Sequence, residues 1–238
     1  MFKSKLSKAY IVIEATLLLA LIVLDIVTIA EGKSIMDKSV GLWNYIGAIK
    51  ISLTSISLLT LILAFFLNRG KRMRRLDLFL IYFALTTTAD VFFSFPLINW
   101  LPHLFFLITY ILFVFIRKGK WYELSIPLVL GVIAFLIMHF VVKMELMTAL
   151  IDSLLGATLL TNCVYCYLNY VRKKERFYLI LGIATTLILI SDASIVGSAF
   201  IHNPLALHNA VAMVNWPFYV SGNVIYVCFY IKEKTASI

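Results

Sequence analysis

Six ionisable side chains lie inside segments of the chain that are otherwise apolar. They are Glu14, Asp25, Lys50, Asp90, Asp152 and Asp192. A charged group at the centre of a lipid bilayer costs about 2.5–3.5 kcal/mol on insertion scales, so such residues usually face the interior of a helix bundle and mark a functional site. Two carboxyl groups held close together can share general acid and general base roles. What these residues do therefore depends on whether the fold brings them together.

The composition of the chain is that of a polytopic membrane protein. Of 238 residues, 62% are hydrophobic and only 14% are charged, whereas a soluble domain has about 25% charged residues. The formal net charge is +9, but the Lys and Arg residues form short clusters between apolar runs. This distribution is typical of membrane topology. We expect an integral membrane protein and no nucleic-acid partner.

Eight apolar segments can each cross a bilayer. About 20 helical residues span a hydrocarbon core of roughly 30 Å, and backbone groups in lipid must bond within their own segment, which favours helices. The segments are 9–30, 43–67, 77–97, 101–116, 123–142, 146–171, 177–199 and 208–231. The sequence therefore predicts an all-α fold, a helical bundle of eight transmembrane helices that forms one membrane domain over residues 1–238.

The basic residues are distributed unequally between the two ends of these segments. Clusters at 3–8, 69–75, 117–120, 172–176 and 232–234 fall on one side, whereas the other side carries only Lys33, Lys38 and Lys143. Positive residues accumulate in cytoplasmic loops, so both termini are predicted to be cytoplasmic. Short loops and the absence of a recognisable targeting signal lead us to expect a bacterial inner (plasma) membrane.

Five of the six ionisable residues are predicted to lie at one depth. With a rise of about 1.5 Å per helical residue, Asp90 and Asp192 lie about 20–22 Å above the cytoplasmic face and Asp25 about 24 Å above it. Lys50 and Asp152 lie about 9–10 Å below the outer face. In a core of about 30 Å these depths coincide. We predict a polar cavity in the outer half of the membrane.

Uncharged polar side chains accompany the central aspartates. A helix places residues i and i+4 on one face. The neighbours are Thr86 and Ser191, and the last segment adds Tyr219 and Asn223, which are four residues apart. Glu14 lies outside this layer, near the cytoplasmic face. His103 and Trp216, at the outer ends of their segments, are interpreted as part of an interfacial belt of aromatic and polar residues.

Other functions fit the same residues in part. Polar contacts between helices, worth about 0.6 kcal/mol each on average, explain a single Asp or Thr but not the concentration of charge at one depth. A proton-coupled transporter of a small molecule or lipid also places charges near the midplane, although no clear internal repeat is present. A non-catalytic lipid-binding or sensor protein is a further alternative. No sequence motif indicates a metal or nucleotide site, so we expect no metal and no cofactor.

Four short stretches are similar to one family of membrane proteins. They are YIGAIKISLTSISL around Lys50, FALTTTADVFFSF around Asp90, LGIATTLILISDASIV around Asp192 and FYVSGNVIYV around Tyr219. By these motifs and by its number of helices, the chain resembles the YhhN family, the eight-helix membrane proteins that include lysoplasmalogenase. It departs from the family in the fourth segment, where Tyr110 stands at the place of the usual His.

The resemblance implies hydrolysis of the vinyl ether bond of a lysoplasmalogen to a fatty aldehyde and a glycerophospho-base. Protonation of the alkene carbon gives an oxocarbenium ion, so the reaction needs one carboxylic acid and one carboxylate, as glycoside hydrolysis does. We assign these roles to Asp90 and Asp192, in an order that the sequence leaves open. The residues expected to bind the lipid or lysophospholipid substrate, or to orient water, are Lys50, Asp152, Tyr219, Asn223, Thr86, Ser191, Asp25 and Tyr110.

Overall fold

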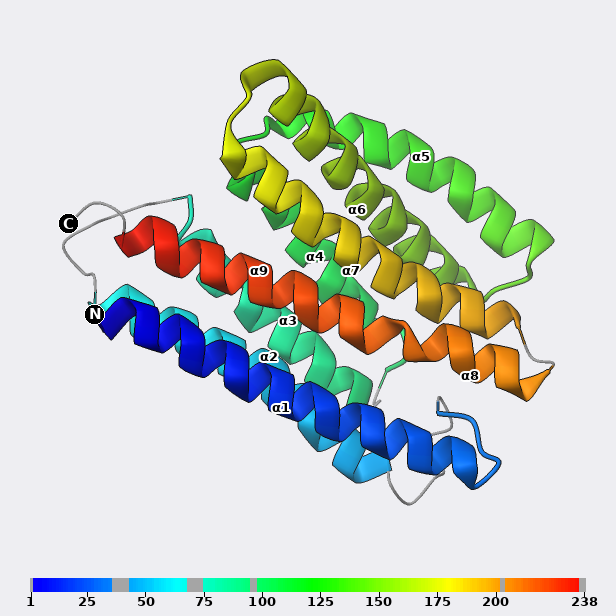
Figure 1. Cartoon of the computed structure of the whole chain (residues 1–238). Coiled ribbons are helices and arrows are strands. Elements are labelled where there is room, and N and C mark those ends of the chain that lie inside the picture. The colour runs from blue at the N-terminus through cyan, green and yellow to red at the C-terminus, as the bar shows by residue number, and fades with distance from the viewer. Residues whose placement is uncertain (1, 36–42, 68–74, 95–97, 202–203, 236–238) are drawn as a thin grey trace.

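The protein is an all-helical bundle. The computed structural model describes residues 2–35, 43–67, 75–94, 98–201 and 204–235. Within these ranges the chain forms nine α-helices and no strand, and the helices lie roughly along one direction (Figure 1). The predicted helical bundle is confirmed.

The helices closely follow the predicted apolar segments. Their bounds are α1 Phe2–Ala30, α2 Trp43–Leu67, α3 Leu78–Ser94, α4 Leu101–Ile116, α5 Ser125–Leu136, α6 Leu146–Lys173, α7 Arg176–Phe200, α8 Leu205–Met213 and α9 Asn215–Thr235. Five stretches are long and apolar enough to cross a membrane: Lys5–Ala30, Tyr45–Leu67, Trp121–Val141, Leu146–Lys173 and Arg176–Ser198. Helices α3 and α4 are shorter apolar helices. Five such stretches suggest an integral membrane protein, and its orientation stays a prediction.

The last predicted span, 208–231, is not one continuous helix. Helix α8 ends at Met213 and α9 begins at Asn215, with Val214 between them. Pro217 explains the break, because its ring collides with the carbonyl four residues earlier, at Met213, and removes one helical N–H donor. Residues that precede a proline are also disfavoured in helical geometry. The prediction of a single helix over 208–231 was wrong in this respect.

The fifth predicted span, 123–142, forms one rod of three parts. A 3₁₀ turn at Trp121–Leu124 leads into α5, and a π-helical turn at Ile137–Val141 ends it. This rod lies at the edge of the bundle and packs on α6 (Figure 1). Gly131 allows close contact with α6, since a Cβ at this position would lie 2.6 Å from Leu154 Cδ2.

Aromatic side chains fill the bundle between α3, α4 and α9. Phe79 and Tyr82 of α3 lie 5.3 and 5.7 Å from the ring of Tyr226, and Phe113 of α4 also lies 5.3 Å from it. These rings are at most 2% exposed. Because they precede Asp90 by two to three turns on α3, the core lies between Asp90 and the end of the bundle where α3 begins.

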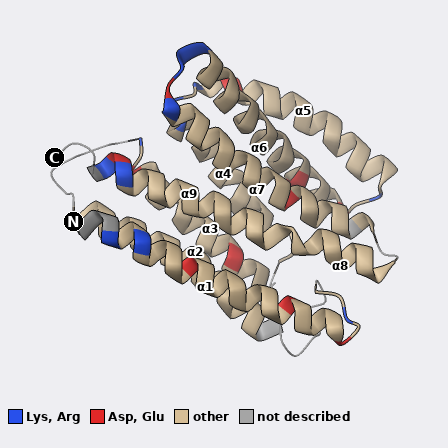
Figure 2. Cartoon of the chain, viewed as in Figure 1, with Lys and Arg blue, Asp and Glu red and all other residues tan. Residues whose placement is uncertain are grey.

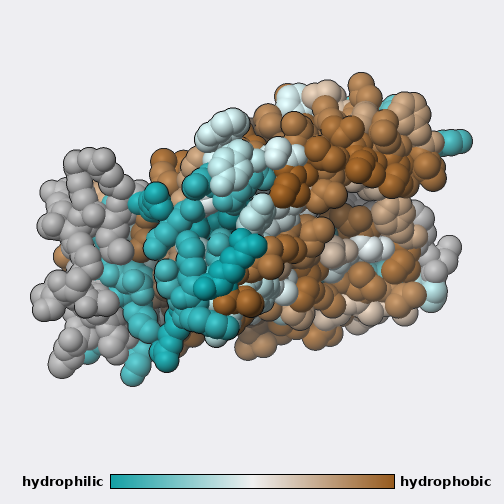
Figure 3. Space-filling model, turned by 90° about the horizontal axis from the view of Figure 1, so that it is seen from above, coloured by the Kyte–Doolittle hydropathy of each residue, from teal (hydrophilic) through white to brown (hydrophobic). Residues whose placement is uncertain are grey.

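Lys and Arg side chains gather at the end of the bundle that holds both termini (Figure 2). Hydrophilic residues cover this end of the surface in Figure 3, and hydrophobic residues cover most of the remainder. Two ion pairs, each with a buried cation and a partly buried carboxylate, lie at this end. Lys234 Nζ is 2.5 Å from Asp77 Oδ1, and Arg117 Nη1 is 2.5 Å from Glu123 Oε2.

Candidate functional site

Asp90 is held by side chains from two other helices. It lies near the C-terminal end of α3, is 5% exposed, and accepts a hydrogen bond of 3.3 Å from the hydroxyl of Tyr219 on α9. Thr54 and Lys50 of α2 also lie within reach of this carboxylate, and the Thr54 hydroxyl donates to the carbonyl of Ile51 at 3.4 Å. Burial opposes the ionised form of Asp90, whereas the Tyr219 hydroxyl and the nearby Lys50 favour it.

Lys50 links Asp90 to two further residues. Its ammonium group lies 4.4 Å from the centre of the Trp216 ring, a distance typical of a cation–π interaction. Asp25 of α1 is 4% exposed and interacts electrostatically with Lys50. We call this set the Lys50 cluster, which consists of Asp25, Lys50, Thr54, Asp90, Trp216 and Tyr219.

Asp192 belongs to a second group of side chains. It lies on α7 and accepts a hydrogen bond of 3.0 Å from the hydroxyl of Tyr110 on α4. His103, two turns earlier on α4, has its Nδ1 atom 2.5 Å from Oδ1 of Asp152 on α6. Both members of this pair lie within electrostatic reach of Asp192. We call His103, Tyr110, Asp152 and Asp192 the Asp192 cluster.

The two clusters are close to each other but have different partners. Asp192 acts electrostatically on Asp90 as well as on Tyr219. The partners described for Asp90 come from α2 and α9, whereas those described for Asp192 come from α4 and α6. Of the residues predicted to lie at one depth, Asp25, Lys50 and Asp90 fall in the first cluster and Asp152 and Asp192 in the second.

The uncharged residues predicted to line the site have three different kinds of contact. Thr86 is buried and donates a hydrogen bond of 2.9 Å to the carbonyl of Tyr82, one turn back on the same helix. Ser191 donates to the side chain of Asn215 and so joins α7 to α9. Asn223 hydrogen bonds to Tyr219.

Asn223 also offers an unused acceptor. Its side chain is 4% exposed, and its Oδ1 atom has no hydrogen-bond partner among the described residues. A buried amide oxygen left unpaired costs free energy, so this atom is suited to accept a hydrogen bond from water or from a substrate hydroxyl beside Tyr219.

Sequence reasoning missed several residues of the two clusters. Thr54 follows Lys50 by one helical turn, so the i, i+4 spacing could have identified it. The interpretation of His103 and Trp216 as interfacial belt residues missed their partners, Asp152 and Lys50. These two contacts join helices that are distant in the sequence, and no local spacing predicts them.

Glu14 lies apart from both clusters. It is 2% exposed and accepts a hydrogen bond of 3.1 Å from Ser57 of α2. The Ser57 hydroxyl also lies 2.8 Å from the hydroxyl of Tyr10. Among the described residues, no group of three or more His, Cys, Asp and Glu side chains is arranged to hold a metal ion.

The fold and the two clusters define a class of protein. It is a helical bundle with helices long and apolar enough to cross a membrane, and it holds two neighbouring groups of carboxylates in its interior. No family model, curated protein or solved structure matches the chain. Membership of the YhhN family therefore stays a prediction from the four motifs.

Proposed function

We propose that the protein is a membrane hydrolase of lysoplasmalogenase type, related to the YhhN family, which cleaves the vinyl ether bond of a lysoplasmalogen. One observation carries the proposal. Two neighbouring aspartates are each bound by a tyrosine hydroxyl, but one of them faces a lysine and the other faces a His–Asp pair. Vinyl ether hydrolysis needs this difference, because one carboxyl must give a proton and the other must take one.

The surroundings of the two aspartates suggest their roles. Asp90 has Lys50 nearby and receives the Tyr219 hydroxyl, so it is suited to be the base. Asp192 receives the Tyr110 hydroxyl and lies near the His103–Asp152 pair, whose two members act on it in opposite directions. Its described partners include no lysine, in contrast to those of Asp90, so Asp192 is the better candidate for the acid.

The reaction then proceeds in three steps. Asp192 transfers its proton to the alkene carbon that is not bonded to oxygen. The other alkene carbon, which carries the ether oxygen (the C–O carbon), then becomes part of an oxocarbenium ion. Asp90 takes a proton from water as the water oxygen adds to the C–O carbon. The hemiacetal loses its hydroxyl proton while the glycerol oxygen gains one, giving a fatty aldehyde and a free glycerol hydroxyl. Return of the Asp90 proton to Asp192 through solvent restores the site.

The proposal is tested with purified protein and a panel of lysoplasmalogens that differ in head group. Free aldehyde should appear with the unaltered protein and should fall by at least 100-fold in Asp90→Asn and Asp192→Asn, because general acid–base groups contribute about 10²–10⁴-fold. Glu14→Gln is the matched control, a buried carboxyl-to-amide change outside both clusters. Full aldehyde release by either Asn variant, or none by the folded unaltered protein, contradicts the proposal.

A lipid-binding protein without turnover is the second candidate. Tyr110 stands where the family usually has His, and a tyrosine is a poor base at neutral pH since its ordinary pKa is about 10. Transport has less support, because the aromatic rings of Phe79, Tyr82, Phe113 and Tyr226 fill the bundle between the aspartates and one of its ends. Tight lysolipid binding without aldehyde would favour the lipid-binding candidate.

A further inference from the structure

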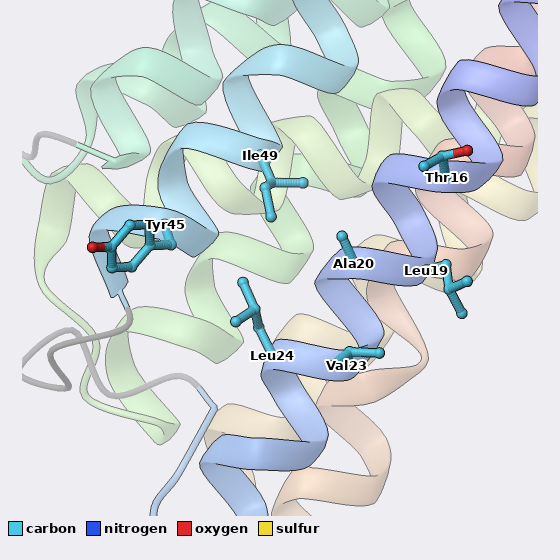
Figure 4. A pocket seen from close by; sticks show the side chains of 7 residues that line it. All are labelled: Thr16, Leu19, Ala20, Val23, Leu24, Tyr45 and Ile49. Atoms are coloured by element: carbon cyan, nitrogen blue, oxygen red, sulfur yellow. The ribbon is translucent and has the colours of Figure 1, made fainter.

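An apolar groove runs between α1 and α2 on the outside of the bundle (Figure 4). Its volume is about 550 Å³, within the range of about 300–1,000 Å³ of small-molecule sites. Leu19, Ala20 and Val23 of α1 form one wall, and Tyr45 and Ile49 of α2 form the other. Leu19, Val23 and Tyr45 are at least half exposed, at 62%, 50% and 65%, so the groove is open on its outer side.

The groove arises from the way the two helices pack. Below it, Leu21 of α1 meets Ile46 and Leu53 of α2 in a separate apolar core, where each of them is at most 2% exposed. Ala20, with its small side chain, leaves space on the outer side of this contact. In a membrane this outer side faces lipid tails, so the groove is lined for hydrocarbon and not for water.

Two residues of the Lys50 cluster, Asp25 and Lys50, follow groove-lining residues along the chain. On α1 the lining residue Leu24 is followed by Asp25, and on α2 the lining residue Ile49 is followed by Lys50. Asp25 and Lys50 interact electrostatically, and Lys50 also contacts the Trp216 ring. An apolar channel for a chain therefore adjoins a cation suited to bind a phosphate and hydroxyl groups suited to bind a glycerol.

We propose that the groove between α1 and α2 binds the single hydrocarbon chain of a lysophospholipid, with the phosphate near Lys50. The chain requires the apolar walls, and the phosphate requires the Lys50 ammonium group, which lies 4.4 Å from the Trp216 ring. The inference rests on the proposed function for the identity of the substrate. It places the lipid on the α1–α2 side, next to Asp90.

The test measures binding without turnover. The probe is a lysophosphatidylcholine with a saturated ether chain that carries a diazirine near its end, which contains no vinyl ether to cleave. After illumination of the full chain in lipid nanodiscs, the labelled residues are mapped by mass spectrometry. Label should concentrate on residues 16–24 and 45–49. An even distribution over the exposed apolar surface would overturn the proposal, whatever the variants do.

Two variants sharpen the result. Ala20→Phe fills the groove and should lower labelling there by about tenfold, equivalent to a tenfold weaker affinity. Val12→Phe is the matched control, because Val12 lies on the same helix, is 63% exposed and lies outside the groove. Unchanged labelling in Ala20→Phe contradicts the proposal, as does an equal loss in both variants.

Further arms separate the head group from the chain and from the chemistry. Lys50→Met should weaken labelling by the phospholipid probe and leave labelling by a phosphate-free monoalkylglycerol probe unchanged. Equal effects on the two probes would overturn the role of Lys50.

Glycerophosphocholine, which has no chain, should not compete with the probe. Full competition would show a phosphate site without a chain site and would overturn the proposal. Labelling of the groove in a protein that releases no aldehyde would refute the proposed reaction and leave the binding site standing.

Discussion

Replacing Tyr110 by Phe isolates the hydrogen bond that the phenol donates to Asp192. The Tyr110 ring is 2% exposed and lies 6.3 Å from Phe106, and a phenylalanine keeps this packing. The variant loses one hydrogen bond of 3.0 Å. In the proposed reaction Asp192 becomes a carboxylate as it gives up its proton, so this bond strengthens toward the transition state. A hydrogen bond to a charged group contributes about 1.5–3 kcal/mol, and about 1.4 kcal/mol corresponds to a factor of ten in rate. We expect kcat/KM for aldehyde release to fall about 10- to 150-fold.

The corresponding change at Asp90 should cost less. Tyr219→Phe removes a longer bond of 3.3 Å, and Lys50 stays beside Asp90. Asp90 loses its charge as it takes a proton, so this bond does not strengthen toward the transition state. An ordinary contribution of about 0.5–1.5 kcal/mol predicts a loss of about 2- to 12-fold. The order of the two effects therefore follows from the opposite directions of the two proton transfers.

The assay is the initial rate of aldehyde release, with thermal unfolding as the control for folding. Tyr110→His introduces the residue usual in the YhhN family and should retain more activity than Tyr110→Phe, because a ring nitrogen can still donate to Asp192. An unchanged rate in Tyr110→Phe would refute the reasoning, and so would a larger loss in Tyr219→Phe.

Three further predictions concern stability and pH. Gly222→Val should overpack the bundle and lower the melting temperature, at a cost of about 1–3 kcal/mol, because a Cβ at this position would lie 2.7 Å from the Ile188 side chain of α7. Gly156→Ala should not lower it, because a Cβ at Gly156 would meet open space. Arg117→Met removes a buried cation from the partly buried carboxylate of Glu123 and should clearly lower the melting temperature. Lys118→Gln, at the exposed neighbour, should have little effect. Glu145 caps α6, and its hydrogen bonds, chiefly that from the Thr148 hydroxyl, lower the pKa of its carboxyl group. The stability that the cap contributes should therefore be fully present above the ordinary pKa of glutamate. It should be lost as the pH falls through the lowered pKa of Glu145. Thermal unfolding across this range should show a pH dependence that Glu145→Gln lacks, and an identical profile in that variant would contradict the assignment.

The helices could be predicted from the sequence because length and hydropathy determine them directly. The rotation of each helix about its own axis could not. In a membrane, the face toward lipid and the face toward the core are both apolar, as Leu19 and Leu21 show. The first is 62% exposed and the second is fully buried, yet they are the same residue type on one helix. Without a polar outer face, hydrophobic periodicity does not indicate which side chains converge.

The distribution of the charges between two clusters depends on this missing rotation. Depth alone places Asp90, Asp152 and Asp192 in one layer, but contacts across the bundle decide the partners of each. Thr54 was within reach of sequence reasoning, since it follows Lys50 by one turn. The pairing of His103 with Asp152 was not, since it depends on how α4 faces α6.

In the proposed reaction, the two clusters face the two reactants. The side chains of His103 and Asp152 are 25% and 22% exposed, so the Asp192 cluster reaches the surface of the bundle, where the proposed reaction requires solvent to exchange protons with it. Two residues of the Lys50 cluster, Asp25 and Lys50, instead follow lining residues of an apolar groove on the outside of the bundle. A hydrolase that acts on a lipid must admit both a hydrocarbon chain and water without mixing their paths. Two neighbouring clusters, one beside each path, meet this requirement better than the single cavity that the depth of the charges predicted.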